Sequence, residues 1–272
     1  MLSLTKKIDA AVKSIRKIDS REVDCAIILG SGLGNIAPTL IRQKNIDYQD
    51  IQNLNPTSVQ SHKGLLTIGE INHKCVAICQ GRHHLYEGYT PQEVVLLVYV
   101  LAALGVKQLI ITNAAGALVS NLNVGDVMII EDHINFTGQN PILGQNDNLE
   151  KRFVDMSQAY NKTLIKEAKN ICNKHSLSHD SGIYVGVLGP SLETSSERRM
   201  LKTLGGSAVG MSTVLEVIAA NHCEMQVLGL SAITNMALGD KNQQVDTIEE
   251  VLKNSAIAGK KMGRIINALL TT

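Results

Sequence analysis

Short polar segments follow several apolar, strand-like runs of this sequence, and their side chains are of kinds that bind anions and small polar ligands. The segments read Gly-Ser-Gly-Leu-Gly at 30–34, Gly-Arg-His-His-Leu-Tyr-Glu-Gly-Tyr at 81–89, Thr-Asn-Ala-Ala-Gly at 112–116, Gly-Met-Ser at 210–212 and Thr-Asn-Met at 234–236. Loops at the carboxyl ends of strands form the ligand crevice of open α/β sheets. Arginine, histidines, hydroxyls and glycine-rich backbone together predict a site for an anion beside a polar organic ligand.

The glycine-rich turn at 30–34 follows one of these runs and precedes a predicted helix over 35–40. Such a turn can present N–H groups and the Ser31 hydroxyl to a phosphate. A dinucleotide fingerprint would need glycine where Asn35 stands, and a P-loop would need Gly-Lys-Ser/Thr, which is absent from this segment. A tight structural turn is the alternative interpretation.

The second segment places Arg82, His84 and Tyr86 at alternating positions. In an extended chain such side chains point to the same side. Arginine is suited to bidentate binding of phosphate, and the histidine and tyrosine could serve the same anion or a sugar hydroxyl. Alternatively, this is a polar surface segment in which Arg82 pairs with Glu87.

Three further polar residues stand next to predicted helices or strands. Ser212 precedes a helix that starts at residue 214, so its hydroxyl could bind an anion or cap that helix. Glu193 precedes the capping box at 194–197 without belonging to it, which leaves its carboxylate available for a ligand. Asn235 follows the last buried strand, where an Asx-turn is the alternative.

The elements that must position these residues alternate between strands and helices. Short runs rich in Val and Ile predict strands covered on both faces, at 25–29, 65–69, 75–79, 108–111, 127–130, 183–187 and 226–231. Helical periodicity is found near the N-terminus and at 91–104, 154–175, 194–204, 214–221 and 248–270. This alternation predicts one α/β domain over residues 1–272 with a mainly parallel sheet.

Composition excludes several classes of function. The net charge is +1 with both signs interspersed, and aromatic residues make up 3%, so we expect no nucleic-acid partner. The longest apolar run, 94–106, is shorter than the ~20 residues that cross a bilayer, so we expect no membrane partner. Five cysteines, an odd number, are expected to be reduced thiols of a cytoplasmic protein.

A series of segments along this chain resembles, in order and spacing, those of the trimeric purine nucleoside phosphorylases, the branch that also contains the methylthioadenosine phosphorylases. They lie at 28–34, 61–64, 80–89, 112–116, 125–140, 189–193, 209–218 and 233–236. The resemblance implies a single-domain nucleoside phosphorylase fold, an α/β fold with a central mixed, mostly parallel β-sheet flanked by helices. It also implies reversible phosphorolysis of 6-oxopurine (deoxy)ribonucleosides such as inosine and guanosine to the free base and α-(deoxy)ribose 1-phosphate. Inorganic phosphate is then a co-substrate, and no metal or organic cofactor is expected.

The resemblance also implies a role for each matching residue. The phosphate-binding positions are Ser31, His62, Arg82, His84, the backbone N–H of Ala114, and Ser212. The ribose contacts are Tyr86 and Met211, and the base contacts are Leu192, Glu193, Val209 and Asn235. Asn235, Glu193 and His84 are the residues expected to act in catalysis. Phe153 matches an aromatic residue that a neighbouring subunit contributes, which implies a homotrimer.

Physical chemistry agrees with these roles. Bound phosphate is itself the nucleophile, so the protein needs donors that hold it rather than a covalent nucleophile. The Asn235 amide can accept from N7–H of the departing purine while donating to O6, and the Glu193 carboxylate can accept from N1–H. Adenine has no N1–H, and the branch that uses 6-aminopurines has Asp at the position of Asn235. Inosine and guanosine are therefore expected to be better substrates than adenosine.

Two positions depart from the family pattern. Leu192 stands where relatives usually have Phe, so an aromatic contact to the base is lost. Ile248, or Thr247 if the preceding loop is aligned differently, stands where relatives have a His that serves the ribose 5′-hydroxyl. Ile248 is therefore expected at the 5′ end of the ribose, where an apolar residue can contact a 5′-methylthio group.

Three alternatives stay open beside the main hypothesis. The chain could prefer 5′-methylthioinosine or xanthosine. It could also be a non-catalytic sensor of nucleoside or phosphate, although a sensor would not need a phosphate nucleophile beside the base. A nicotinamide-dependent oxidoreductase lacks support because the dinucleotide fingerprint is absent.

Overall fold

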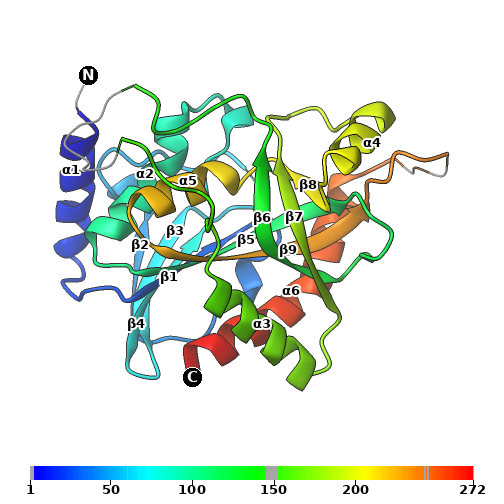
Figure 1. Ribbon diagram of the computed structural model, residues 1–272. Coiled ribbons are helices and arrows are strands. Elements are labelled where there is room, and N and C mark those ends of the chain that lie inside the picture. Colours follow the sequence, from blue (N-terminus) through cyan, green and yellow to red (C-terminus); the bar gives the residue numbers. More distant parts are fainter. Residues whose placement is uncertain (1–2, 60, 145–151, 242, 244, 272) are drawn as a thin grey trace.

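The computed structural model describes residues 3–59, 61–144, 152–241, 243 and 245–271. It is an α/β structure in which helices lie on both sides of a twisted mixed sheet (Figure 1). Within the described residues, nine strands follow the order β2-β3-β4-β1-β5-β8-β7-β6-β9. Their bounds are β1 Cys25–Leu29, β2 Ile41–Asp47, β3 Leu65–Ile71, β4 Lys74–Gln80, β5 Gln108–Ala117, β6 Val127–Asn135, β7 His179–Gly186, β8 Ala208–Gly210 and β9 Gln226–Met236.

The middle of the sheet consists of parallel strands. β1 pairs in parallel with β4 and β5, and β5 pairs in parallel with β9. All five residues of β1, Cys-Ala-Ile-Ile-Leu, are buried, as expected for a parallel strand covered on both faces. The carboxyl ends of β1, β4, β5 and β9 therefore reach the same edge of the sheet.

The second half of the sheet closes on itself. β5 pairs with β8, β8 with β7, β7 with β6, and β6 with β9. Since β9 also pairs with β5, these strands form a ring. β5 thus belongs both to the open sheet and to the ring, and its register fixes the two parts against each other.

The helices form two groups that cover opposite sides of the sheet. α1 contacts α2, and α2 contacts α5, while α3 and α6 contact each other and α6 packs on β9 (Figure 1). A Thr90–Glu93 capping box begins α2, whose central residues are buried and apolar. The bounds are α1 Leu4–Arg16, α2 Pro91–Ala103, α3 Lys162–Lys174, α4 Ser195–Thr203, α5 Val214–His222 and α6 Ile248–Thr271.

The predicted α/β class is confirmed, and three local predictions need correction. The helix expected over 35–40 is only a 3₁₀ turn, Gly34–Ile36, followed by the unpredicted strand β2. The helix expected from residue 154 begins at Lys162, because the Asn161 side chain caps its first turn. The short strand β8 was also not predicted.

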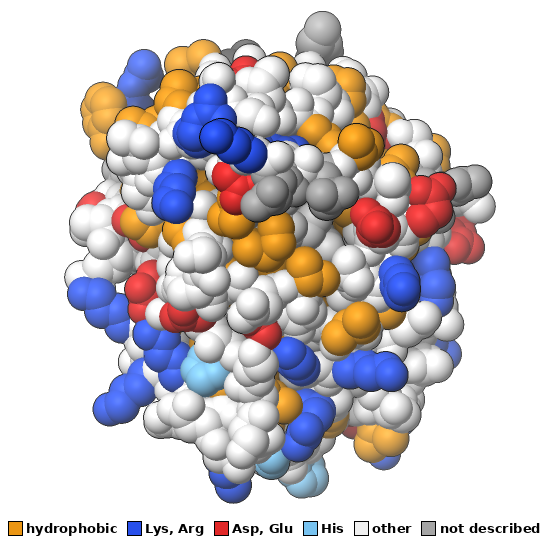
Figure 2. Space-filling model, turned by 90° about the vertical axis from the view of Figure 1, so that its right-hand side faces the viewer, with side chains coloured by type: hydrophobic (Ala, Val, Ile, Leu, Met, Phe, Trp, Pro, Cys, Tyr) orange, Lys and Arg blue, Asp and Glu red, His pale blue; other side chains and the backbone are white. Residues whose placement is uncertain are grey.

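The surface is mixed in charge. Figure 2 shows basic and acidic side chains together on the face that lies at the right of Figure 1, around hydrophobic side chains near its centre. This mixture agrees with the formal net charge of +1. Within the described residues, no helix combines the length and the apolar character needed to cross a membrane.

Candidate active site

A cavity of about 610 Å³ opens at the edge of the sheet where β1, β4, β5 and β9 end, and the start of α6 forms part of its wall. Most residues predicted for the site line this one cavity. They are Ser31, Arg82, His84, Tyr86, Ala114, Leu192, Glu193, Val209, Met211, Ser212, Asn235, Thr247 and Ile248.

Two predicted residues are not among those that line the cavity. His62 lies behind Ser31, with its Nε2 3.2 Å from the Ser31 hydroxyl and its Nδ1 3.1 Å from the backbone oxygen of Arg82. Burial lowers the pKa of His62 to about 3, so this ring is neutral at physiological pH. Phe153 is 88% exposed, on the surface of its own chain.

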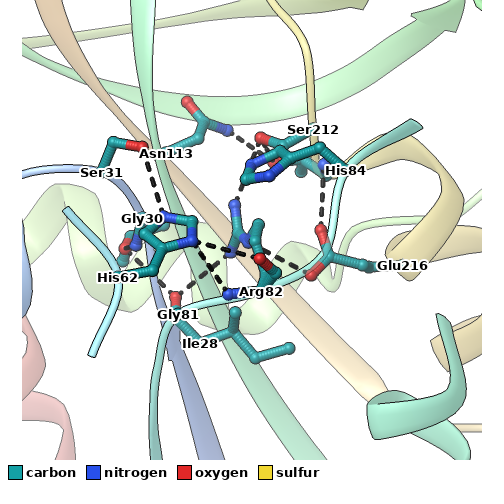
Figure 3. A network of polar contacts seen from close by, with 12 residues as sticks. Ile28, Gly30, Ser31, His62, Gly81, Arg82, His84, Asn113, Ser212 and Glu216 are labelled. Carbon is teal, nitrogen blue, oxygen red and sulfur yellow. Dashed lines mark hydrogen bonds and ion pairs between the residues drawn. The ribbon is translucent and has the colours of Figure 1, made fainter. Parts of the chain in front are cut away.

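Arg82 supplies a cation to the cavity lining and lies in the middle of a network of polar contacts (Figure 3). Its side chain is 2% exposed, and its Nε lies 3.2 Å from a carboxylate oxygen of Glu216. Nη1 donates to the Ser212 hydroxyl at 3.2 Å, and Nη2 donates to the Ile28 carbonyl at 3.5 Å. A guanidinium has five N–H groups in a rigid fork, so these contacts orient it and leave donors for a ligand anion.

Glu87 does not pair with Arg82, as one interpretation of the sequence allowed, but with His84. Glu87 Oε2 lies 2.8 Å from His84 Nδ1 and also accepts from the His84 backbone N–H at 2.8 Å. Burial works to raise the pKa of Glu87, but the hydrogen bonds from His84 and Ser58 outweigh it and lower that pKa to about 2. Burial lowers the pKa of His84. With Nδ1 directed at Glu87, the other ring nitrogen is the one left for the cavity.

Ser212 is not the cap of α5, because Thr213 holds that position. Thr213 has a φ of +73°, which is a strained conformation for a β-branched residue. The Asn113 amide donates to its hydroxyl at 2.9 Å, and its N–H donates to Glu216 at 3.0 Å. These contacts maintain the turn, and the Ser212 hydroxyl stays beside Arg82 rather than serving the helix.

The cavity wall contains a second polar network around Asn235 and Asp246. The Asn235 amide donates from Nδ2 to Asp246 Oδ1 at 2.8 Å, and its Oδ1 accepts from the Thr234 hydroxyl at 2.9 Å. Asp246 Oδ2 accepts from Arg198 Nη2 at 2.6 Å. Arg198 Nε lies 3.9 Å from Glu193. Burial raises the pKa of Glu193, partly opposed by the Arg198 charge.

Beside these two polar networks, aromatic and apolar side chains line the cavity. Burial raises the pKa of Tyr86 to about 12, so its hydroxyl stays protonated. The Tyr86 ring stacks on that of His84 with a centroid distance of 4.6 Å. Ile248, Val251 and Leu252 of α6 present an apolar wall.

Sequence reasoning missed several residues of the site, namely Asn113, Arg198, Thr213, Glu216, Thr234 and Asp246. The spacing Thr213-x-x-Glu216 is a capping-box pattern that could have drawn attention to Glu216. No local pattern predicts the pair of Arg198 and Asp246, which stand 48 positions apart. Among the described residues, no group of three or more His, Cys, Asp or Glu is placed to hold a metal ion.

Comparison with known proteins defines the class to which this fold and this cavity belong. The model of the phosphorylase superfamily matches residues 24–271. The chain belongs to this superfamily.

Relatives that match nearly the whole chain show to which members of the superfamily it is similar. The chain is 43% identical over 264 residues to purine nucleoside phosphorylase 1 of Geobacillus stearothermophilus, covering 97% of this chain and 96% of the relative. It is 42% identical over 254 residues to purine nucleoside phosphorylase of Mus musculus, covering 90% and 87%. Its structure is similar to that of Schistosoma mansoni purine nucleoside phosphorylase in complex with inosine, with a TM-score of 0.92, 32% identity and coverage of 100% and 98%. Within the superfamily, the chain thus falls among the purine nucleoside phosphorylases.

Proposed function

We propose that this protein catalyses the reversible phosphorolysis of 6-oxopurine nucleosides, inosine and guanosine, to the free purine and α-ribose 1-phosphate. The observation that supports this function best is that one cavity joins an anion-binding end around Arg82 and Ser212 to a carboxylate and an amide, Glu193 and Asn235. Similar structures of Schistosoma purine nucleoside phosphorylases contain guanosine, inosine or hypoxanthine, and one contains adenosine. The comparisons and the site thus support the same chemistry.

Phosphate is the co-substrate and the nucleophile in this proposal. One of its oxygens forms a bond to C1′ of the ribose while the bond from C1′ to N9 breaks, and the bonding electron pair leaves with the purine. The fixed fork of Arg82 and the hydroxyl of Ser212 are suited to hold the attacking anion in line. The proposed phosphate contacts are Ser31, Arg82, His84, the N–H of Ala114, and Ser212, and His62 acts behind them through its hydrogen bond with the Ser31 hydroxyl.

Glu193 and Asn235 stabilise the departing purine. Negative charge develops on the base as the C–N bond breaks, and a fixed partner at such a position is worth ~3–4 kcal/mol in transition-state stabilisation. The departing purine anion takes a proton at N7 from water; Asn235 accepts from this N7–H and donates to O6, and Glu193 accepts from N1–H. Both contacts suit a 6-oxopurine.

Apolar and aromatic side chains place the sugar and the base. Tyr86 and Met211 contact the ribose, and Leu192 and Val209 line the base pocket. Val209 is 4% exposed whereas Leu192 is 53% exposed, so Val209 is the more rigid of the two walls.

A preference for 5′-methylthioinosine is the second candidate, and the observation that favours it is the wall formed by Ile248, Val251 and Leu252. None of these side chains can donate to or accept from a ribose 5′-hydroxyl. They can contact a methylthio group, whose burial is favourable by ~0.8 kcal/mol per CH₂-sized unit.

The proposed assembly is a homotrimer in which Phe153 reaches the site of a neighbouring subunit. The Phe153 side chain is 88% exposed, which leaves its ring accessible to a neighbouring subunit. All five cysteines are free thiols, which suits a cytoplasmic location. Light scattering of the wild type and of Phe153→Ala, each with activity, tests the assembly.

The test of function is hypoxanthine release by the purified protein from inosine and from 5′-methylthioinosine, each with and without phosphate. Release from inosine that depends on phosphate is the expected result. A higher kcat/KM for 5′-methylthioinosine would establish the second candidate. Binding of inosine without any product would instead favour a sensor.

A further inference from the structure

Asp246 is a buried carboxylate in the base end of the cavity that neither the sequence nor the proposed mechanism assigns. Its side chain is 8% exposed, and it lines the cavity two residues before α6 begins. One carboxylate oxygen accepts from Asn235 Nδ2 at 2.8 Å, and the other accepts from Arg198 Nη2 at 2.6 Å. Asp246 thus touches the residue proposed to recognise the purine without needing to touch the purine itself.

The hydrogen bonds of Asn235 define which way its amide faces. A carboxamide has two N–H donors and two lone pairs on its oxygen. Asp246 takes one donor. The Thr234 hydroxyl lies 2.9 Å from the amide oxygen and 3.3 Å from the Ala115 carbonyl, and its one proton can serve either acceptor, so Asp246 is the partner that fixes the orientation. One N–H and one lone pair remain for a ligand. Because an ion-paired carboxylate only accepts hydrogen bonds, a flipped amide would turn its oxygen toward Asp246 and lose this bond.

Through its contact with Arg198, Asp246 also affects the Glu193 carboxylate. The guanidinium makes its close contact with Asp246, whereas its Nε stays 3.9 Å from Glu193. Among the described residues, this Nε has no hydrogen-bond partner although it is buried. Asp246 therefore draws Arg198 away from Glu193 and leaves the Glu193 carboxylate free to accept from a ligand.

We propose that Asp246 is a specificity-determining positioning residue that selects 6-oxopurines over 6-aminopurines by fixing the orientation of the Asn235 amide. The inference rests on the proposed function. A 6-oxopurine presents an acceptor at C6 and N7–H as it departs, and the fixed amide offers the matching N–H and lone pair. A departing 6-aminopurine also carries N7–H but presents a donor at C6, to which the fixed N–H cannot donate. Turning the amide oxygen toward this amino group would lose the hydrogen bond from Asn235 to Asp246.

The experiment compares kcat/KM for inosine and for adenosine in the wild type and in Asp246→Asn. An asparagine can donate as well as accept, so it suits either orientation of Asn235. The inosine-to-adenosine ratio should fall about 10- to 100-fold, the range that corresponds to one buried hydrogen bond left unmade. The KM for phosphate should not change. Glu249→Gln is the matched control, because it removes an exposed carboxylate three residues further on and should leave the ratio as it is.

Each outcome of this experiment supports or overturns the proposed role of Asp246. A merely structural role of Asp246 would lower both activities together, so an unchanged ratio overturns the proposal, as does adenosine turnover that stays undetectable in the variant. Should Asp246→Asn fail to fold, Asp246→Ser places a hydroxyl that can donate as well as accept at this position, and its ratio must fall in the same direction. A wild type that releases no hypoxanthine removes the proposed function and this inference together. An active wild type with an unchanged ratio overturns the role of Asp246 alone.

Discussion

Replacement of Arg82 by lysine tests whether the shape of the guanidinium, and not only its charge, holds the phosphate. Arg82 divides its nitrogens between Glu216 at 3.2 Å through Nε and Ser212 at 3.2 Å through Nη1. A lysine has one nitrogen at the end of a flexible chain. It can pair with Glu216 or reach a phosphate held beside Ser212, but it cannot do both.

The expected magnitude follows from the bonds that lysine cannot make. A hydrogen bond to a charged group contributes ~1.5–3 kcal/mol, and ~1.4 kcal/mol corresponds to a factor of ten in binding. Loss of one such bond to phosphate should raise the KM for phosphate about 10- to 150-fold. The KM for inosine should change little, because Glu193 and Asn235 belong to the polar network around Asp246 and Arg198, apart from the contacts of Arg82.

The assay is initial-rate release of hypoxanthine, with phosphate varied at saturating inosine and then inosine varied at saturating phosphate. Arg42→Lys is the control, since the Arg42 side chain is 78% exposed and its pair with Glu70 is 3.6 Å long. An exposed pair of this kind contributes only ~0–1 kcal/mol. An unchanged KM for phosphate in Arg82→Lys, or an effect confined to inosine, would refute the reasoning.

Three further expectations concern the remaining polar groups. Asn235→Ala should lower kcat/KM for inosine by ~10²–10³ while the fold stays intact, and wild-type activity in this variant would remove Asn235 from the mechanism. Because burial raises the pKa of Glu193, its carboxylate is protonated on acidification at a higher pH than an ordinary glutamate, whose pKa is about 4.3. The acid limb of the kcat/KM profile for inosine should therefore lie above that value and disappear in Glu193→Gln; an identical limb in the variant would assign it to another group. Glu216→Gln leaves the Arg82 charge buried without its partner and should lower the free energy of unfolding by ~3–5 kcal/mol, measured by urea denaturation; an unchanged midpoint would show that the pair does not stabilise the fold.

The elements that the sequence predicted correctly are those whose burial leaves a strong pattern. β1 and β4 are short, apolar and buried in the interior of the sheet, so their composition alone identifies them. β2 is an edge strand in which nearly every residue is exposed, and its polar sequence has no alternation to detect. β8 has only three residues and exists because β5 and β7 lie on either side of it.

The residues of the site also fall into those that the sequence predicted and those that it did not. Arg82 and Ser212 stand in polar segments directly after or before regular elements, and such positions can be recognised along the chain. The pairing of Arg198 with Asp246 depends on helix α4 meeting the segment before α6, and no spacing in the sequence encodes it. The strained Thr213 could not be predicted either, because its φ of +73° follows from contacts with Asn113 and Glu216.

The double membership of β5 in the open sheet and in the ring has a consequence for how the chain folds. Its neighbours β1, β8 and β9 begin at residues 25, 208 and 226, so most of its pairings join segments far apart in the sequence. Long-range pairings of this kind slow folding, since the entropy cost of closing a long loop comes before the stabilising contacts form. The bond of Arg82 to Ser212 alone spans 130 residues. Affinity for phosphate is therefore acquired only when nearly the whole chain has folded, and a ligand present during refolding stabilises that last state by mass action.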